Sequence, residues 1–179
     1  MAIETLRPTA NVNPTLGSAW SSPANAYDGN SGTAATANES TTNGSVAAAF
    51  ELTTWQTAAF QSGYSALALK VSYSISVSTT STGAGTASAL WSLAYSTDGG
   101  STFTVIASGS GSQSLTTAVV TLATNQDLTK LQFAISVSAA ATPRTGTAGA
   151  SCDGSLVDVW TEGTYVPGLA GCSGHLFGF

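Results

Sequence analysis

The side chains that could perform acid–base or nucleophilic chemistry are few in this sequence and lie far apart. The 179 residues include 4 Lys and Arg side chains, 9 Asp and Glu side chains and one histidine. A nucleophile–histidine–acid triad would have to use His175, but the Gly-x-Ser-x-Gly turn that typically exposes a nucleophilic serine is missing. Asp158 and Glu162 share strand parity, as paired carboxylates of a glycoside hydrolase could. We expect them instead to face solvent or to pair with Arg7 or Arg144, so the sequence predicts no catalytic residue and no enzyme.

Metal and redox chemistry has equally little support. Cys152 and Cys172 are twenty positions apart, and a bond between them would tie the last strand to the C-terminal tail and contribute up to ~3 kcal/mol. Synthesis in a reducing cytoplasm argues against that bond, so both states stay open. Zinc needs closer Cys and His spacings than these. Asp28 could hold calcium only with carbonyl oxygens and Glu39, so we expect neither a metal nor a cofactor.

Two turn motifs resemble known local structures. Ser96–Phe103 resembles the Asp-box hairpin of sialidase propellers, in which Asp98 would accept hydrogen bonds from turn amides and Phe103 would re-enter the core. Propellers carry several copies, whereas this chain has one and lacks an arginine cluster for a carboxylate substrate. Ala26–Thr33 is similar to an Asp-Gly turn of discoidin-like jelly rolls. We expect both segments to be well-made turns around Asp98 and Asp28.

The charge distribution excludes some classes of partner. Nucleic-acid affinity depends on several Lys and Arg contacts made together. The basic residues here are scattered along the chain: Arg7, Lys70, Lys130 and Arg144. No stretch approaches the ~20 apolar residues of a membrane span, and the first residues lack the pattern of a secretory signal. We therefore expect a protein that is made in a cytoplasm and binds neither nucleic acid nor membrane.

The elements that must position these residues have the period of β-strands. Apolar and small residues alternate over Leu67–Val77 and Leu131–Val137, and glycine-rich turns separate seven or eight such segments. This pattern predicts an all-β protein, an antiparallel β-sandwich or jelly roll with extended N- and C-terminal arms. We assign residues 1–44 to an N-terminal arm and polar loop region with at most one short strand, 45–166 to the sandwich domain, and 167–179 to a C-terminal tail.

Three segments resemble small structural proteins of tailed bacteriophages. Val157–Tyr165 is similar to an Asp-Val-Trp-x-Glu-Gly-Thr-Tyr ending of such proteins, and Leu6–Pro8 and Tyr27–Gly29 are similar to their opening. The resemblance covers the start and the end of the chain. It implies a β-sandwich or jelly roll that decorates the head, neck or tail of the virion and carries no catalytic residues.

The expected function is a capsid cement or decoration protein that bridges copies of the major capsid protein, with a homotrimer as the favoured oligomer. A neck or tail protein is the alternative within this class. The expected interface residues are apolar side chains near the two ends of the chain: Leu6, Leu169, Leu176, Phe177 and Phe179. The alternative from another class is a jelly-roll glycan-binding module for host attachment, which would need Trp20, Trp55 or Tyr64 on its surface.

Overall fold

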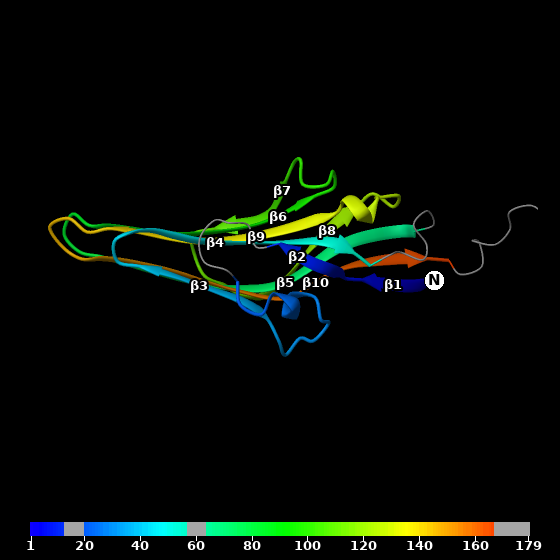
Figure 1. Ribbon diagram of the computed structural model, residues 1–179, viewed down its shortest axis with the longest axis horizontal. Coiled ribbons are helices and arrows are strands. Elements are labelled where there is room, and N and C mark those ends of the chain that lie inside the picture. Colours follow the sequence, from blue (N-terminus) through cyan, green and yellow to red (C-terminus); the bar gives the residue numbers. More distant parts are fainter. Residues whose placement is uncertain (13–19, 57–63, 167–179) are drawn as a thin grey trace, which may run out of the picture.

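The chain forms two antiparallel β-sheets that pack face to face (Figure 1). The computed structural model describes residues 1–12, 20–56 and 64–166. Sheet A contains β1 (Ala2–Leu6), β3 (Ala35–Thr41), β5 (Tyr64–Ser81), β8 (Gln113–Leu122) and β10 (Ala148–Tyr165). Sheet B contains β2 (Pro8–Val12), β4 (Gly44–Trp55), β6 (Thr86–Ser96), β7 (Thr104–Gly109) and β9 (Gln132–Thr142). Short 3₁₀ turns occur at Pro23–Ala26 and Leu128–Lys130. The predicted all-β sandwich is confirmed.

The sheet orders place β10 and β9 at the centre of the molecule. Sheet A runs β1-β10-β5-β8, with β3 on the same edge of β10 as β1, and sheet B runs β2-β4-β9-β6-β7. The long strands β5 and β10 pair along most of their lengths. No helix in the described part of the chain is long and apolar enough to cross a membrane.

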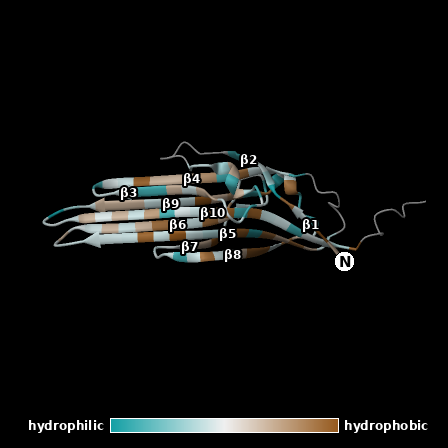
Figure 2. Cartoon of the chain, turned by 90° about the horizontal axis from the view of Figure 1, so that it is seen from below, coloured by the Kyte–Doolittle hydropathy of each residue, from teal (hydrophilic) through white to brown (hydrophobic). Residues whose placement is uncertain are grey.

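The alternating pattern of the sequence becomes the core between the sheets. On β5, Leu67, Leu69 and Val71 are buried, whereas the serines between its apolar residues face outward. On β9, Phe133 and Ile135 are buried in the same way. Figure 2 shows this alternation as brown bands separated by paler ones along the strands. The two stripes predicted to share one core do so, because side chains with period 2 all point to one face.

The core becomes thinner toward one end of the molecule, here called the tip, where the β3–β4, β5–β6 and β9–β10 turns lie (Figure 1). Large side chains such as Phe50 and Phe133 fill the middle. Toward the tip Glu39 and Cys152 are buried, but most of the buried residues are alanines: Ala48, Ala89, Ala139, Ala141, Ala148 and Ala150. At the tip a Cβ on Gly146 would overlap the Thr82 carbonyl oxygen, so glycine is required for this approach of the two turns.

The N-terminal region corrects the predicted domain boundary at residue 45. β1 pairs with β10 and β2 pairs with β4, so both strands belong to the sandwich, as does β3. Trp20 is 2% exposed and its ring stacks on Phe50 at a centroid distance of 5.8 Å. Pro8 does not prevent pairing, because it is the first residue of an edge strand, where a missing N–H is tolerated. The prediction of an N-terminal arm is therefore wrong for the residues described there.

The Asp-box segment forms the hairpin between β6 and β7. Asp98 accepts hydrogen bonds from the Ser96 hydroxyl at 2.6 Å, the Thr102 hydroxyl at 2.6 Å and the Thr102 amide at 2.9 Å. These bonds, that of Ser96 first, hold the pKa of Asp98 well below its usual range. Phe103 is 39% exposed, so the expectation that it re-enters the core is wrong. Its parity matches Val105, which pairs with Ala94 and is itself exposed on sheet B.

Candidate functional site

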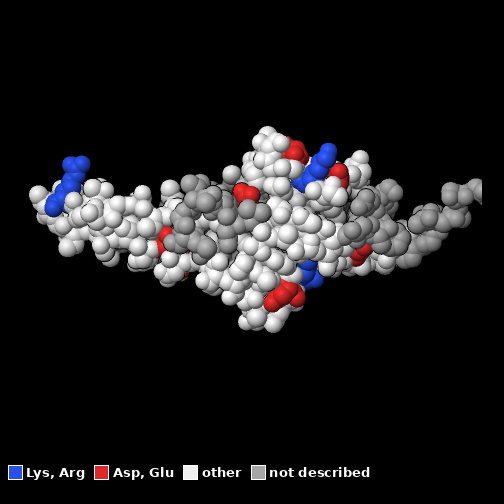
Figure 3. Space-filling view, viewed as in Figure 1, with Lys and Arg blue, Asp and Glu red and all other residues white. Residues whose placement is uncertain are grey.

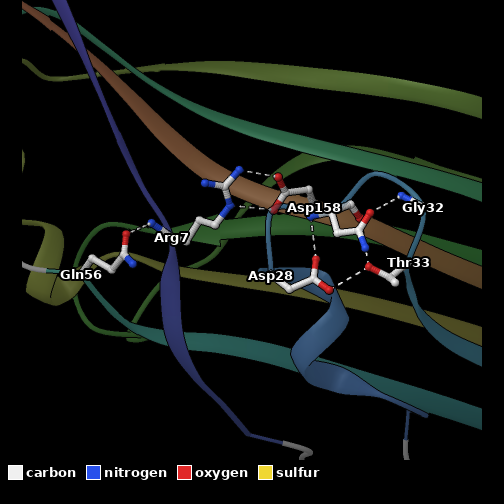
Figure 4. A network of polar contacts seen from close by, with 7 residues as sticks. Arg7, Asp28, Gly32, Thr33, Gln56 and Asp158 are labelled. Atoms are coloured by element: carbon white, nitrogen blue, oxygen red, sulfur yellow. Dashed lines mark hydrogen bonds and ion pairs between the residues drawn. The ribbon is translucent and has the colours of Figure 1, made fainter.

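A network of long-range polar contacts surrounds Arg7, the single residue between β1 in sheet A and β2 in sheet B (Figure 4). Its guanidinium donates to both carboxylate oxygens of Asp158 on β10, at 2.9 Å from Nη2 and 3.3 Å from Nε. The backbone N–H of Arg7 donates to the side-chain Oε1 of Gln56 at 3.0 Å, and the backbone carbonyl oxygen of Arg7 accepts from the backbone N–H of Gln56 at 2.9 Å. Arg7, Gln56 and Asp158, here called the crossover clamp, join the two sheets where the chain crosses between them.

An Asp-Gly turn lies against the guanidinium. Asp28 accepts hydrogen bonds from the Asn30 amide and the Thr33 hydroxyl, both at 2.8 Å. These bonds lower the pKa of Asp28, the Asn30 amide most, with a smaller effect from the charge of Arg7. Gly29 has φ +75°, and a Cβ there would lie 3.0 Å from Arg7 Cζ. The predicted turn is therefore present, and only glycine gives the arginine this much room.

The clamp brings together three segments that are remote in sequence. Leu6–Pro8, Tyr27–Gly29 and the Asp158 end of Val157–Tyr165 meet around one guanidinium (Figure 4). The predicted partnership of Asp158 with Arg7 is confirmed. Glu162 pairs with Lys70 instead of an arginine. Both carboxylate oxygens of Asp158 are bound by Arg7, and this bidentate arrangement fixes the orientation of the two side chains and strengthens their contact.

We expect the clamp to contribute measurably to stability. A double-mutant cycle of Arg7→Ala and Asp158→Ala, followed by denaturant unfolding, should give a coupling free energy of about 1–2 kcal/mol. The Arg7 and Asp158 side chains are 28% and 12% exposed, against 29% and 27% for Lys70 and Glu162. The same cycle on that more exposed pair is the control and should give less than about 1 kcal/mol. Equal couplings would show that the bidentate geometry adds nothing.

The predicted interface and disulfide residues have different outcomes. Leu6 is 6% exposed and belongs to the hydrophobic core, so its assignment to an interface is wrong; its partner in register is the buried Thr161. The other candidates lie outside the described residues: Leu169, Leu176, Phe177, Phe179, Cys172 and His175. Cys152 is fully buried and has no disulfide partner among the described residues, and its Sγ lies 3.6 Å from the Leu90 carbonyl oxygen. A bond to Cys172 is not part of the described structure.

The aromatic residues expected on a glycan-binding surface lie inside the sandwich. Trp20 and Trp55 are buried, and Trp55 donates its indole N–H to the Leu131 carbonyl oxygen at 2.9 Å. Tyr64 is buried against Gly163, where a Cβ would overlap its ring, and it donates its hydroxyl to Glu4. Burial, and then the bond to Glu4, raise the pKa of Tyr64. The glycan hypothesis therefore loses the residues on which it was based.

The outer faces of the sheets carry short side chains with isolated large apolar residues among them. On β5 the outward residues include Ser72, Ser74 and Ser76. Figure 3 shows few charged atoms on the face that it presents. Large apolar side chains are exposed on both faces and at the β7 and β8 edges: Ile3, Leu90, Val105, Leu115 and Val119. The exposure of Ile3, Val105, Leu115 and Val119 was missed because these residues lie on edge strands, where alternation does not report burial.

No family model matches the chain. No curated protein matches it either. The described residues contain no group of three or more His, Cys, Asp or Glu side chains that could hold a metal ion. The described surface consists of extended β-faces that carry few charged side chains.

Proposed function

We propose that this protein is a non-enzymatic structural protein of a tailed-phage virion, a cement or decoration protein that bridges copies of the major capsid protein. The observation that supports this most is the set of large apolar side chains exposed on otherwise short-chained β-faces, such as Leu115 and Val119 on β8. A protein partner that covers such exposed side chains gains the free energy of burying their apolar surface. The similarity of the segments at the crossover clamp to phage structural proteins points in the same direction.

The energetics suit a repeated lattice contact. Burying one large apolar side chain contributes roughly 1.5–3 kcal/mol. Ser, Thr and Ala side chains lose little conformational freedom when a partner covers them. A net charge of −5 with few charged groups also gives weak repulsion between neighbouring copies. A few contacts per copy would therefore accumulate over many copies of the protein.

The proposal includes a homotrimer on the outside of the capsid, since closed cyclic oligomers match the symmetry axes of a shell. A neck or tail position is the second candidate, and the elongated outline with a narrow tip supports it (Figure 1). Such a body can enter a ring or channel tip first. The two positions differ in how many copies a virion needs.

Quantitative mass spectrometry of purified virions tests the proposal. A cement protein should be present in hundreds of copies per particle and a neck or tail protein in roughly a dozen or fewer, as their different symmetries require. Absence of the protein from purified virions would overturn the virion role. Light scattering of the purified protein should give the mass of a trimer, and a monomer at all concentrations would contradict that part.

A further inference from the structure

Trp160 is the tryptophan that does not belong to the core. The other three tryptophans are at most 7% exposed: Trp20, Trp55 and Trp91. On β10 the neighbours Val159 and Thr161 are both fully buried, so the side chain between them points to the outer face of sheet A, where Trp160 is partly exposed. Across the sheet, Trp160 on β10 pairs in register with Lys70 on β5, and Lys70 pairs in register with Val119 on β8. An indole, an ammonium group and an isopropyl group thus form one row across three strands.

A groove of about 350 Å³ lies beside this row on the same face. Lys70 lines it together with Ile3, Ala66, Ala68, Thr121, Glu162 and Thr164. The short side chains of Ala66 and Ala68 form the floor of the groove, and the longer side chains on the neighbouring strands form its walls. Trp160 does not line the groove, but it borders it: it pairs in register with Lys70 and lies two residues, about 7 Å along β10, from Glu162 on the same face. The volume is within the range of small-ligand sites, roughly 300–1,000 Å³.

The charges of the groove favour a neutral ligand. Lys70 and Glu162 form an ion pair within it, so its walls supply hydrogen-bond donors and acceptors without a net charge. A phosphate or carboxylate ligand would have to compete with Glu162 for the ammonium group. Thr121 and Thr164 add hydroxyl groups that can both donate and accept. A ligand with many hydroxyl groups and no charge matches this set.

We propose that this face of sheet A binds a neutral carbohydrate. A pyranose ring has a C–H face that can stack on the indole of Trp160, as apolar groups do on aromatic rings, and a rim of hydroxyl groups. Lys70, Glu162 and Thr121 hydrogen-bond that rim above Ala68. The site goes beyond the proposed structural role, and on a virion it would attach the particle to a glycosylated surface.

Saturation-transfer NMR of the whole protein tests the site with methyl glycosides of glucose, galactose, mannose and N-acetylglucosamine at millimolar concentration. We expect transfer to at least one of the four. Trp160→Ala should weaken that binding at least about tenfold, as the loss of an aromatic anchor does. Ala68→Phe should weaken it similarly by filling the groove. Leu90→Ala, on the outer face of sheet B, is the control and should bind as the wild type does.

Ala68→Phe keeps the test valid if Trp160→Ala does not fold. Ala68 lies between the buried Leu67 and Leu69, so its side chain faces outward and a larger one leaves the core intact. Failure of the wild type to bind any of the four glycosides would overturn the proposal. The proposal would also be overturned if Ala68→Phe bound the glycosides as the wild type does. If Ala68→Phe changed the oligomeric state without changing glycoside binding, the groove would be an interface between copies, and the proposal would be wrong. Incorporation of Ala68→Phe into virions tests the structural role separately.

Discussion

Replacing Trp20 by Ala is expected to lower the free energy of unfolding by about 3–5 kcal/mol, as truncation of a buried aromatic residue does. The indole is 2% exposed, stacks on Phe50, and lies where a Cβ on Gly154 would come within 2.7 Å of it. The facing residue on β10, Gly154, has no side chain that could fill the space left by the indole. Denaturant unfolding followed by circular dichroism measures the change.

The same experiment decides whether the N-terminal region belongs to the domain. If residues before β4 were an arm, Trp20→Ala would change the free energy of unfolding by less than about 0.5 kcal/mol, as exposed substitutions do. Leu115→Ala provides the matched control, since Leu115 is 64% exposed on an edge strand. A small effect of Trp20→Ala, equal to that of the control, would contradict the packing of the Trp20 segment into the core.

Replacing Glu39 by Met should stabilise the protein by about 1–3 kcal/mol, the cost of a buried polar group without a partner. Glu39 is 2% exposed on β3, and its Oε1 atom has no hydrogen-bond partner. It faces the core in register with Cys152, close to the alanine-lined part. Methionine has nearly the same volume and removes the polar group. An increase in the melting temperature is the expected readout.

Glu39→Gln is the control, because it keeps the shape of the side chain and its polar end. We expect it to stabilise the protein less than Glu39→Met does. A loss of stability in Glu39→Met would show that the carboxyl group has a favourable interaction in the folded state. A charged side chain turned inward on an edge strand also discourages pairing with other chains. We therefore expect Glu39→Met to be more stable and to associate more readily, which light scattering would detect.

The sequence was sufficient to predict the core strands and insufficient for the edges. The alternation of Leu67–Val77 records burial directly, because one face of β5 is covered along most of its length. The short strands β1 and β2 carry few large apolar residues, and their pairing depends on contacts such as Arg7 with Asp158, 151 residues apart. Local patterns do not contain information about such partners.

The position of Trp160 shows the same limit at the candidate site. A bulge between Leu156 and Asp158 shifts the register of β10 against β5. Leu156 and Val159 are both fully buried although their parities differ, so simple alternation through this segment assigns one of the two to the wrong face. Trp160 shares the parity of Asp158 and Glu162, which were expected to face solvent, but the groove beside it is built from β1, β5, β8 and β10 and emerges only from the pairing of the strands.

The thinning of the core toward the tip has a mechanical consequence. Cohesion between the sheets depends on the apolar area that each residue buries, and an alanine buries much less than a phenylalanine. The free energy of local opening should therefore decrease along the long axis, and amide protons near the Thr82 and Gly146 turns should exchange with solvent before those beside Phe50 and Phe133. A load applied at the tip would separate the sheets progressively from that end. The molecule thus combines a compliant end with a stiff one.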